Sequence, residues 1–403
     1  MSVELSSVLL YLAIFLIAAK VGALLATKLK QPEVFGELLV GILIGPSVAG
    51  WISQHFDLPM LVDPASDAGA FIDVMANIGI ILLLFLAGLS IDMDQLRAAG
   101  KSAIAVATSG VIVAFSLGFG IANLLGWSGM QAAFVGAVLA ATSVGITVRT
   151  LMDIHQLHTP VGMTVLGAAV ADDIIGIFIL SALVGLSMGS FSIEEFGKLI
   201  FFVAVFLLAS LYIGLKVVPR LLTHVAKFPV EEITLSIALA FAFLMAMFAE
   251  HSRLAAITGA FIAGVVLSKA PVAGALTNKL STLGYSLFIP LFFVQMGTCV
   301  DLRALWSISL LALGVVGVAI FDKIVGCGIG ALLSGFGLKD SIRVGTAMMP
   351  RAEVALIVAS IGMKAGIVTA DLLSITVVIV LVTSLITPLM VKYTFQGSPT
   401  DSK

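Results

Sequence analysis

The sequence contains little charge. Only 11% of its 403 residues are Asp, Glu, Lys or Arg, whereas 60% are hydrophobic and the mean hydropathy is +1.19. Soluble domains carry about 25% charged residues. The shortage therefore excludes a soluble globular domain and indicates a polytopic membrane protein whose main solvent is the bilayer. The net charge of −2 comes without a basic patch, so nucleic acid is not expected as a partner.

Cysteine is scarce as well. Cys299 and Cys327 are too few for a disulfide framework or a metal cluster, and no cofactor is expected. The N-terminus lacks the basic region and the small-residue cleavage site of a signal peptide, so we expect the first apolar segment to be retained. No extended polar tail is present, so an attached soluble regulatory domain is not expected either.

Long apolar runs, in contrast, are abundant. A membrane-spanning helix needs about 20 mostly apolar residues. By that measure the sequence predicts an all-α polytopic membrane protein with 13 transmembrane helices, at approximately 6–29, 34–51, 70–90, 101–127, 130–150, 161–188, 195–222, 230–250, 255–271, 284–300, 304–335, 340–364 and 371–395. The second and ninth segments are short and rich in glycine.

The distribution of Lys and Arg predicts the orientation. If the N-terminus lies outside, most of the 21 Lys and Arg residues fall on the inner side. The outer side then receives only Lys198, Arg253, Arg303 and Lys364. This bias supports an odd number of spans. It predicts a multi-pass protein of the cell (inner) membrane with an outer N-terminus and a cytoplasmic C-terminus.

Two short patterns recur seven segments apart. Gly36 and Gly41 of segment 2 match Gly259 and Gly264 of segment 9, and Gly88-Leu-Ser-Ile-Asp92 matches Gly297-Thr-Cys-Val-Asp301. An odd offset inverts the topology, as in many secondary transporters. The sequence thus predicts two inverted six-helix repeats, about 6–188 and 230–395, joined by a linker helix at about 195–222.

This repeat pairs segment 5 with segment 12, and each carries a polar interruption, at Ala141–Thr147 and Met348–Val354. Pro350 removes a backbone donor, and Gly145 loosens its helix. Interruptions at corresponding positions predict crossed discontinuous helices around an ion site at the bilayer midplane. Ordinary helix kinks are the alternative.

The adjacent acids Asp172 and Asp173 lie in the middle of an apolar segment, where ionisable residues are usually functional. Lys323 lies near the middle of segment 11 and needs a counter-ion at that depth. The aspartate pair is the expected partner, and one carboxylate then remains for a transported ion. Asp322 points about 100° away from Lys323 around the helix, so we expect it to face another cavity or segment.

Five further residues lie in the interruptions. Arg351 and Glu353 are expected to support the core of the fold, each at a helix end or facing the other. Thr142 and Ser143, together with Thr147, offer hydroxyl oxygens to a cation. The alternative for these hydroxyls is hydrogen bonding to the preceding helical turn.

These motifs resemble the monovalent cation:proton antiporter-2 family, and within it the NapA-type sodium/proton antiporters. The resemblance covers essentially the whole chain and is carried, in order, by Gln31–Ser47, Leu83–Leu89, Ala141–Ser143, Val170–Asp173 and Met349–Leu356. There are two departures. Ser90 stands where many relatives have an acid, and Asp322 precedes the lysine.

The resemblance implies a single antiporter membrane domain that forms a homodimer in the lipid bilayer. Segments 4–6 and 11–13, about 101–188 and 304–395, would form a mobile core, and the other segments a dimerisation domain. Asp173 would be the ion-binding carboxylate and the site of the monovalent cation. Asp172 would pair with Lys323, a salt-bridge partner or proton carrier, and Thr142 and Ser143 would lie by the crossing of the broken helices.

The expected function is antiport of a monovalent cation, Na⁺ before Li⁺ or K⁺, against H⁺, with both ions competing at Asp173. A K⁺/H⁺ antiporter is the nearest alternative, although the nucleotide-binding domain of the Kef-type branch is absent. The paired acids disfavour an organic anion transporter on a related fold. An intramembrane aspartyl protease is disfavoured because consecutive aspartates splay about 100° apart. A non-transporting sensor is disfavoured because both aspartates and the lysine are present.

Overall fold

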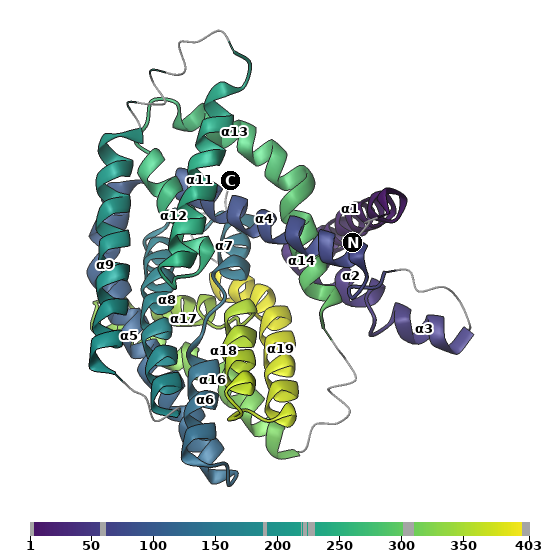
Figure 1. The fold of residues 1–403 in the computed structure, drawn as a ribbon, viewed down its shortest axis with the longest axis vertical. Coiled ribbons are helices and arrows are strands. Elements are labelled where there is room, and N and C mark those ends of the chain that lie inside the picture. Colours follow the sequence, from purple (N-terminus) through teal and green to yellow (C-terminus); the bar gives the residue numbers. More distant parts are fainter. Residues whose placement is uncertain are drawn as a thin grey trace.

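A computed structural model describes residues 4–56, 62–187, 192–218, 220, 224, 230–300 and 310–396. The elements of this part of the chain are all helices (Figure 1). They are α1 (Leu5–Lys28), α2 (Glu33–Ile44), α3 (Ala49–Phe56), α4 (Asp67–Leu89), α5 (Met93–Leu124), α6 (Gly129–Ala140), α7 (Val144–Asp153), α8 (Pro160–Ser187), α9 (Ile193–Lys216), α11 (Ile233–His251), α12 (Ala256–Leu267), α13 (Ala273–Leu283), the π-helix η1 (Gly284–Phe288), α14 (Ile289–Thr298), α16 (Leu310–Leu333), α17 (Leu338–Ala347), α18 (Glu353–Lys364) and α19 (Ala370–Phe395).

Eleven stretches of the described chain are long and apolar enough to cross a membrane. One of them joins α6 to α7, and another runs from α13 through η1 to α14. Two shorter apolar helices, Ala256–Leu267 and Val354–Lys364, accompany them. The predicted all-helical, polytopic class is therefore confirmed. Parts of three predicted segments lie outside the described residues: 188 of the sixth, 219 and 221–222 of the seventh, and 304–309 of the eleventh.

Three predicted boundaries differ from the structure. Segment 2 ends at Ile44, because Gly45 is extended and Pro46 follows it, and the chain resumes as α3. Helix α5 begins at Met93 instead of 101, since the Asp92 side chain caps the polar first turn by accepting from Asp94 N at 2.8 Å. Segment 10 begins earlier, at α13, and is continuous through the π-turn η1.

The helices on either side of the two interruptions form what we term the broken-helix bundle, comprising α5–α8 and α16–α19. Helix α5 packs against α6, α8 and α16, and α16 packs against α17 and α19. The seam between α5 and α16 is close, because Gly326 and Gly330 of α16 face the backbone around Ser109 and Gly110. Both cysteines are free thiols. Cys327 is fully buried beside Gly110, whereas Cys299 is exposed at the end of α14.

A second group, the glycine bundle, comprises α1, α2, α4 and α11–α14. Its helices approach at glycine pairs. A Cβ at Gly41 of α2 would lie 2.9 Å from the Cα of Gly297 in α14, and a Cβ at Gly264 of α12 would lie 2.8 Å from the Cα of Gly88 in α4. Such contacts pack backbones directly together, which drives helix association in lipid. Figure 1 shows α1, α2 and α14 gathered on one side of the molecule.

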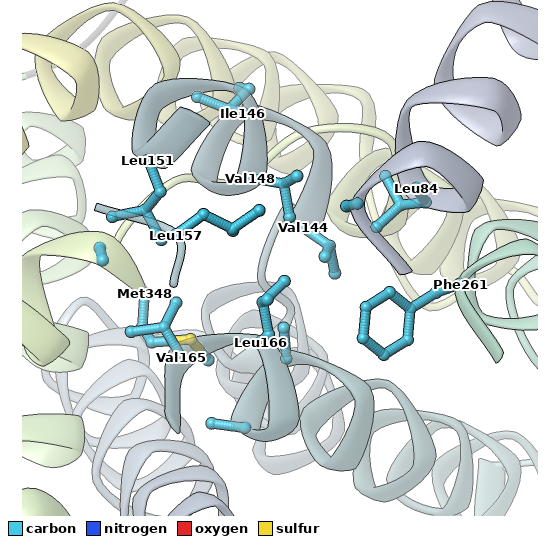
Figure 2. Packing of buried hydrophobic residues seen from close by; sticks show 14 of the residues in the cluster. Leu84, Val144, Ile146, Val148, Leu151, Leu157, Val165, Leu166, Phe261 and Met348 are labelled. Atoms are coloured by element: carbon cyan, nitrogen blue, oxygen red, sulfur yellow. The ribbon is translucent and has the colours of Figure 1, made fainter. Parts of the chain in front are cut away.

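An apolar layer separates the two bundles. Figure 2 shows Val144 of α7 and Leu166 of α8 facing Leu84 of α4 and Phe261 of α12, all members of one buried cluster. These side chains bury apolar surface between the bundles.

Candidate functional site

The two interrupted helices touch at their breaks. The first break separates α6 from α7 at residues 141–143, and the second separates α17 from α18 at residues 348–352. Ser143 N donates to Pro350 O at 2.7 Å. Thr147 Oγ1 donates to Ala347 O at 2.6 Å and to Ser143 O at 3.1 Å. Backbone groups freed by the breaks therefore satisfy one another across the two helices, as a bilayer core requires.

Asp172 and Lys323 form a buried ion pair between α8 and α16. Lys323 Nζ donates to Asp172 Oδ1 at 2.7 Å, and the two side chains are 0% and 2% exposed. The structure thus brings together the two residues that the sequence predicted as partners. At this depth each charge requires the other.

The neighbouring Asp173 points toward a different helix. Its Oδ2 accepts a hydrogen bond from Thr258 Oγ1 at 2.7 Å. Thr258 is 2% exposed and lies in the first turn of α12, in the glycine bundle, whereas Asp173 is only partly buried. The two adjacent carboxylates therefore serve different contacts: Asp172 stays within its own bundle, and Asp173 reaches across to the other.

The hydroxyl residues of the first break also differ from one another in their hydrogen bonding. Thr142 and Ser143 are buried, and Thr142 Oγ1 has no hydrogen-bond partner among the described residues. A buried hydroxyl in that state has lone pairs to offer a ligand. Thr147 instead makes the bond to its preceding helical turn, together with the bond across the breaks.

Arg351 ties the second break to the surrounding helices. Its Nη2 donates to Leu139 O, in the last turn of α6, at 2.8 Å, and its Nη1 donates to Ala319 O at 2.5 Å and also to Met349 O. A guanidinium suits this place, because helix C-termini present carbonyls with partial negative charge. Glu353 begins α18, and its side chain lies outside the described part of the structure.

Asp322 is the carboxylate partner of Arg351. Its Oδ1 accepts from Arg351 Nη2 at 2.5 Å and from Lys323 N at 2.5 Å. The side chains of both members are 0% exposed. Asp322 thus faces a different segment from Lys323, and the two buried cations each have a carboxylate of their own, Asp172 for Lys323 and Asp322 for Arg351.

A second polar cluster crosses between the bundles at Arg149 of α7. Arg149 Nη2 lies 2.9 Å from Glu33 Oε2 and 3.9 Å from Glu37 Oε1, and its Nε lies 3.1 Å from Asp153 Oδ1. The Tyr285 ring centroid lies 4.6 Å from Arg149 Cζ. Glu37 is fully buried, and its two carboxylate oxygens have no hydrogen-bond partner within the described chain. Sequence reasoning assigned Arg149 only to the charge bias, and it did not single out Thr258.

Comparison with known proteins gives a consistent picture. A family model described as "Sodium/hydrogen exchanger, transmembrane" matches residues 13–397. The Na⁺/H⁺-K⁺ antiporter GerN of Bacillus cereus is 35% identical over 387 residues, which cover 95% of each chain. A Na⁺/H⁺ antiporter of Enterococcus hirae is 33% identical over 388 residues, with 95% of this chain and 96% of that one covered. The sodium proton antiporter MjNhaP1 of Methanocaldococcus jannaschii shares the fold, with a TM-score of 0.70 and 19% identity over 98% of this chain and 97% of that one.

Proposed function

The chain belongs to the sodium/hydrogen exchanger family, and on that premise we propose that it exchanges Na⁺ for H⁺ across the cell membrane by alternating access. Membership makes it a multi-span secondary transporter and not an enzyme. One observation carries the mechanism: of two adjacent carboxylates, one is held by a buried lysine and the other lies at the boundary between two helix bundles.

The proposed architecture has 13 spans in two inverted repeats, with α12 and the α17–α18 pair completing the eleven long stretches. The glycine contacts support it. The repeat equates Gly41 with Gly264 and Gly297 with Gly88, and the structure packs Gly41 on Gly297 and Gly264 on Gly88. Exchanging the two halves of the chain therefore converts the Gly41–Gly297 contact into the Gly264–Gly88 contact. Inverted repeats predict such a matched pair of contacts.

Within this architecture the broken-helix bundle is the moving core. The glycine bundle, with α9, is the fixed domain through which two copies form a homodimer. The apolar layer between the bundles supports this division, because its side chains can slide past one another without leaving polar groups unpaired, whereas the cluster around Arg149 would have to exchange its partners. The N-terminus would lie outside and the C-terminus in the cytoplasm, in line with the Lys and Arg bias.

In the proposed cycle, cation and proton compete for the Asp173 carboxylate. When protons are scarce, Na⁺ binds the ionised carboxylate, and Thr142 and Ser143 supply hydroxyl oxygens from the first break. When protons are abundant, H⁺ displaces Na⁺ from the same group. Competition at one site that opens alternately to each side gives antiport without a separate gate for each ion.

The buried pair adds a second step. If Na⁺ is also coordinated by the Asp172 carboxylate, the ion pair between Asp172 and Lys323 weakens, and the lysine can release its proton. The cycle would then move more than one proton per cation and carry net charge. Lys323 is therefore the proposed second proton carrier, and Arg351 a support that keeps the two breaks together.

The test is cation-driven proton movement in proteoliposomes loaded with a pH-sensitive dye, with Na⁺, Li⁺ and K⁺ added in turn. Wild-type protein should respond to Na⁺, and Asp173→Ala should abolish the response. Exchange that persists in Asp173→Ala would overturn the site assignment. Unchanged electrogenicity in Lys323→Ala would exclude the lysine as an obligatory proton carrier.

K⁺/H⁺ exchange is the second candidate function. It is favoured by the likeness to GerN, whose name includes K⁺ beside Na⁺ and H⁺. The same vesicles decide between the two, since a K⁺ response that exceeds the Na⁺ response would make K⁺ the principal cation.

A further inference from the structure

The hydrogen bond between Thr258 and Asp173 joins the two bundles at the proposed ion site. Thr258 belongs to α12, which is packed backbone to backbone against α4 at Gly264 and Gly88. Asp173 belongs to α8, which packs against α5. If the broken-helix bundle moves and the glycine bundle does not, this bond must break in every transport cycle.

The residues beside Thr258 on α12 are apolar. Ile257 and Phe261 flank Thr258 along α12, and both belong to the buried cluster that also contains Leu166 and Ala169 of α8. Figure 2 shows Phe261 and Leu166 of this cluster. Other polar contacts between the bundles lie elsewhere, around Arg149 and at the exposed pair of Lys269 with Asp94. In an apolar setting the strength of a hydrogen bond depends strongly on whether its acceptor is charged.

We propose that Thr258 is a positioning residue that holds the core in place while Asp173 is ionised and empty. This inference rests on the proposed function. A hydroxyl that donates to a carboxylate forms a charge-assisted bond about twice as strong as a neutral one. A proton or a cation on Asp173 removes or shares that charge, so the bond weakens and the loaded core is released.

The contact would thereby enforce coupling. An antiporter exchanges two ions tightly only if its core does not reorient while empty. A core that returns empty after delivering a proton would give a proton leak without cation movement. The Thr258 bond stabilises the core most when Asp173 is ionised and carries no ion. It therefore raises the barrier to movement of the empty core more than the barrier to movement with Na⁺ or H⁺ bound.

The experiment compares Thr258→Val, which keeps the shape of the side chain without its hydroxyl, with Thr258→Ser, which keeps the hydroxyl. The matched control is Thr298→Val in the glycine bundle. Thr298 is 1% exposed, and its hydroxyl donates within α14 to Gln295 O at 2.8 Å. Each protein is reconstituted into vesicles in choline thiocyanate, whose permeant anion compensates charge, and proton leak down an imposed pH gradient is measured without Na⁺.

Thr258→Val should raise the Na⁺-free proton leak roughly tenfold over wild type, the factor expected when a charge-assisted bond is lost from one state of the cycle. It should also lower the number of ²²Na⁺ ions moved per proton. Thr258→Ser and Thr298→Val should behave as wild type. Thr258→Ala removes the hydroxyl without adding a methyl, and it should give the same leak as Thr258→Val, so the test does not depend on the folding of one variant.

Two results would overturn the proposal: a leak in Thr258→Val and Thr258→Ala equal to that of wild type, or a leak in Thr258→Ser as large as theirs. Neither result counts against the proposed function if the wild-type protein exchanges Na⁺ for H⁺ and Asp173→Ala does not. Absence of exchange in wild type would instead count against the function itself.

Discussion

Two ion pairs in this protein have almost the same length and opposite burial. Lys323 lies 2.7 Å from Asp172, with side chains 0% and 2% exposed, and Lys279 lies 2.8 Å from Glu232, with side chains 52% and 55% exposed. If burial determines what a lysine contributes, removal of its charge should have very different consequences at the two sites.

The perturbation is replacement of each lysine by methionine, which keeps an unbranched side chain and removes the charge. Lys323→Met leaves Asp172 as a buried carboxylate without its cation, and loss of one partner of a buried pair costs about 3–5 kcal/mol of stability. Lys279→Met removes an exposed pair and should cost about 1 kcal/mol or less. The expected difference is thus at least about 2 kcal/mol.

The assay is denaturation of the purified protein in one detergent at neutral pH, with the midpoint of each variant compared. A third variant, Asp172→Asn combined with Lys323→Met, removes both charges and should regain most of the lost stability, because the penalty arises from the unpaired ion. The reasoning is refuted if Lys323→Met and Lys279→Met fall by the same amount. It is also refuted if the double variant is no more stable than Lys323→Met alone.

Five further substitutions test other contacts. Gly41→Ala places a Cβ 2.2 Å from Val294 O in the facing helix and should cost about 1–3 kcal/mol of stability. Gly100→Ala, whose Cβ would meet no atom of another element within 4 Å, should be neutral or slightly stabilising, and equal denaturation midpoints of the two variants would contradict this. Thr142→Val should raise the Na⁺ concentration needed for half-maximal exchange and leave stability unchanged. Thr147→Val should lower stability by about 1–3 kcal/mol. A Thr142→Val protein that loses stability but keeps its Na⁺ dependence would count against Thr142 as a ligand. Arg149→Gln leaves its buried cluster without its central cation and should lower the free energy of unfolding by about 3–5 kcal/mol. A loss under about 1 kcal/mol would show that the cluster is neutral or hydrated.

Most of the fold could be predicted from apolar runs, because a chain in lipid must satisfy its backbone within helices and has few alternatives. The two interruptions were also predictable, since Pro350 and the polar residues near Thr142 conflict with a continuous apolar helix. Hydropathy did not predict the start of α5 or the π-turn before α14. The start of α5 depends on the helix cap at Asp92. The π-turn depends on Pro290, which lacks an N–H at the start of α14. Both features arise from hydrogen bonding, which hydropathy does not report.

The site was predictable only where few partners were available. A buried lysine requires an acid, so Lys323 could be assigned to the pair of Asp172 and Asp173, and the family resemblance singled out Asp172. The helical rotation separated Asp322 from the Lys323 side chain but did not identify the partner of Asp322. That partner is Arg351, which also contacts a helix end at Leu139 O of α6, one of the two alternatives predicted for it. Thr258 gave no signal, because hydroxyl residues in apolar helices usually bond to their own preceding turn. Its role depends on the approach of two helices, which the local sequence does not encode.

The close seam between α5 and α16 also makes the native thiols informative. Cys327 is sealed beside Gly110, in the same helix as Lys323, whereas Cys299 is exposed at the end of α14. A small maleimide should therefore modify Cys299 readily. It should not modify Cys327 while α5 and α16 remain in contact. Quantitative mass spectrometry of the two peptides would then follow the opening of the core in the unaltered protein, with one cysteine as the reporter and the other as its internal standard.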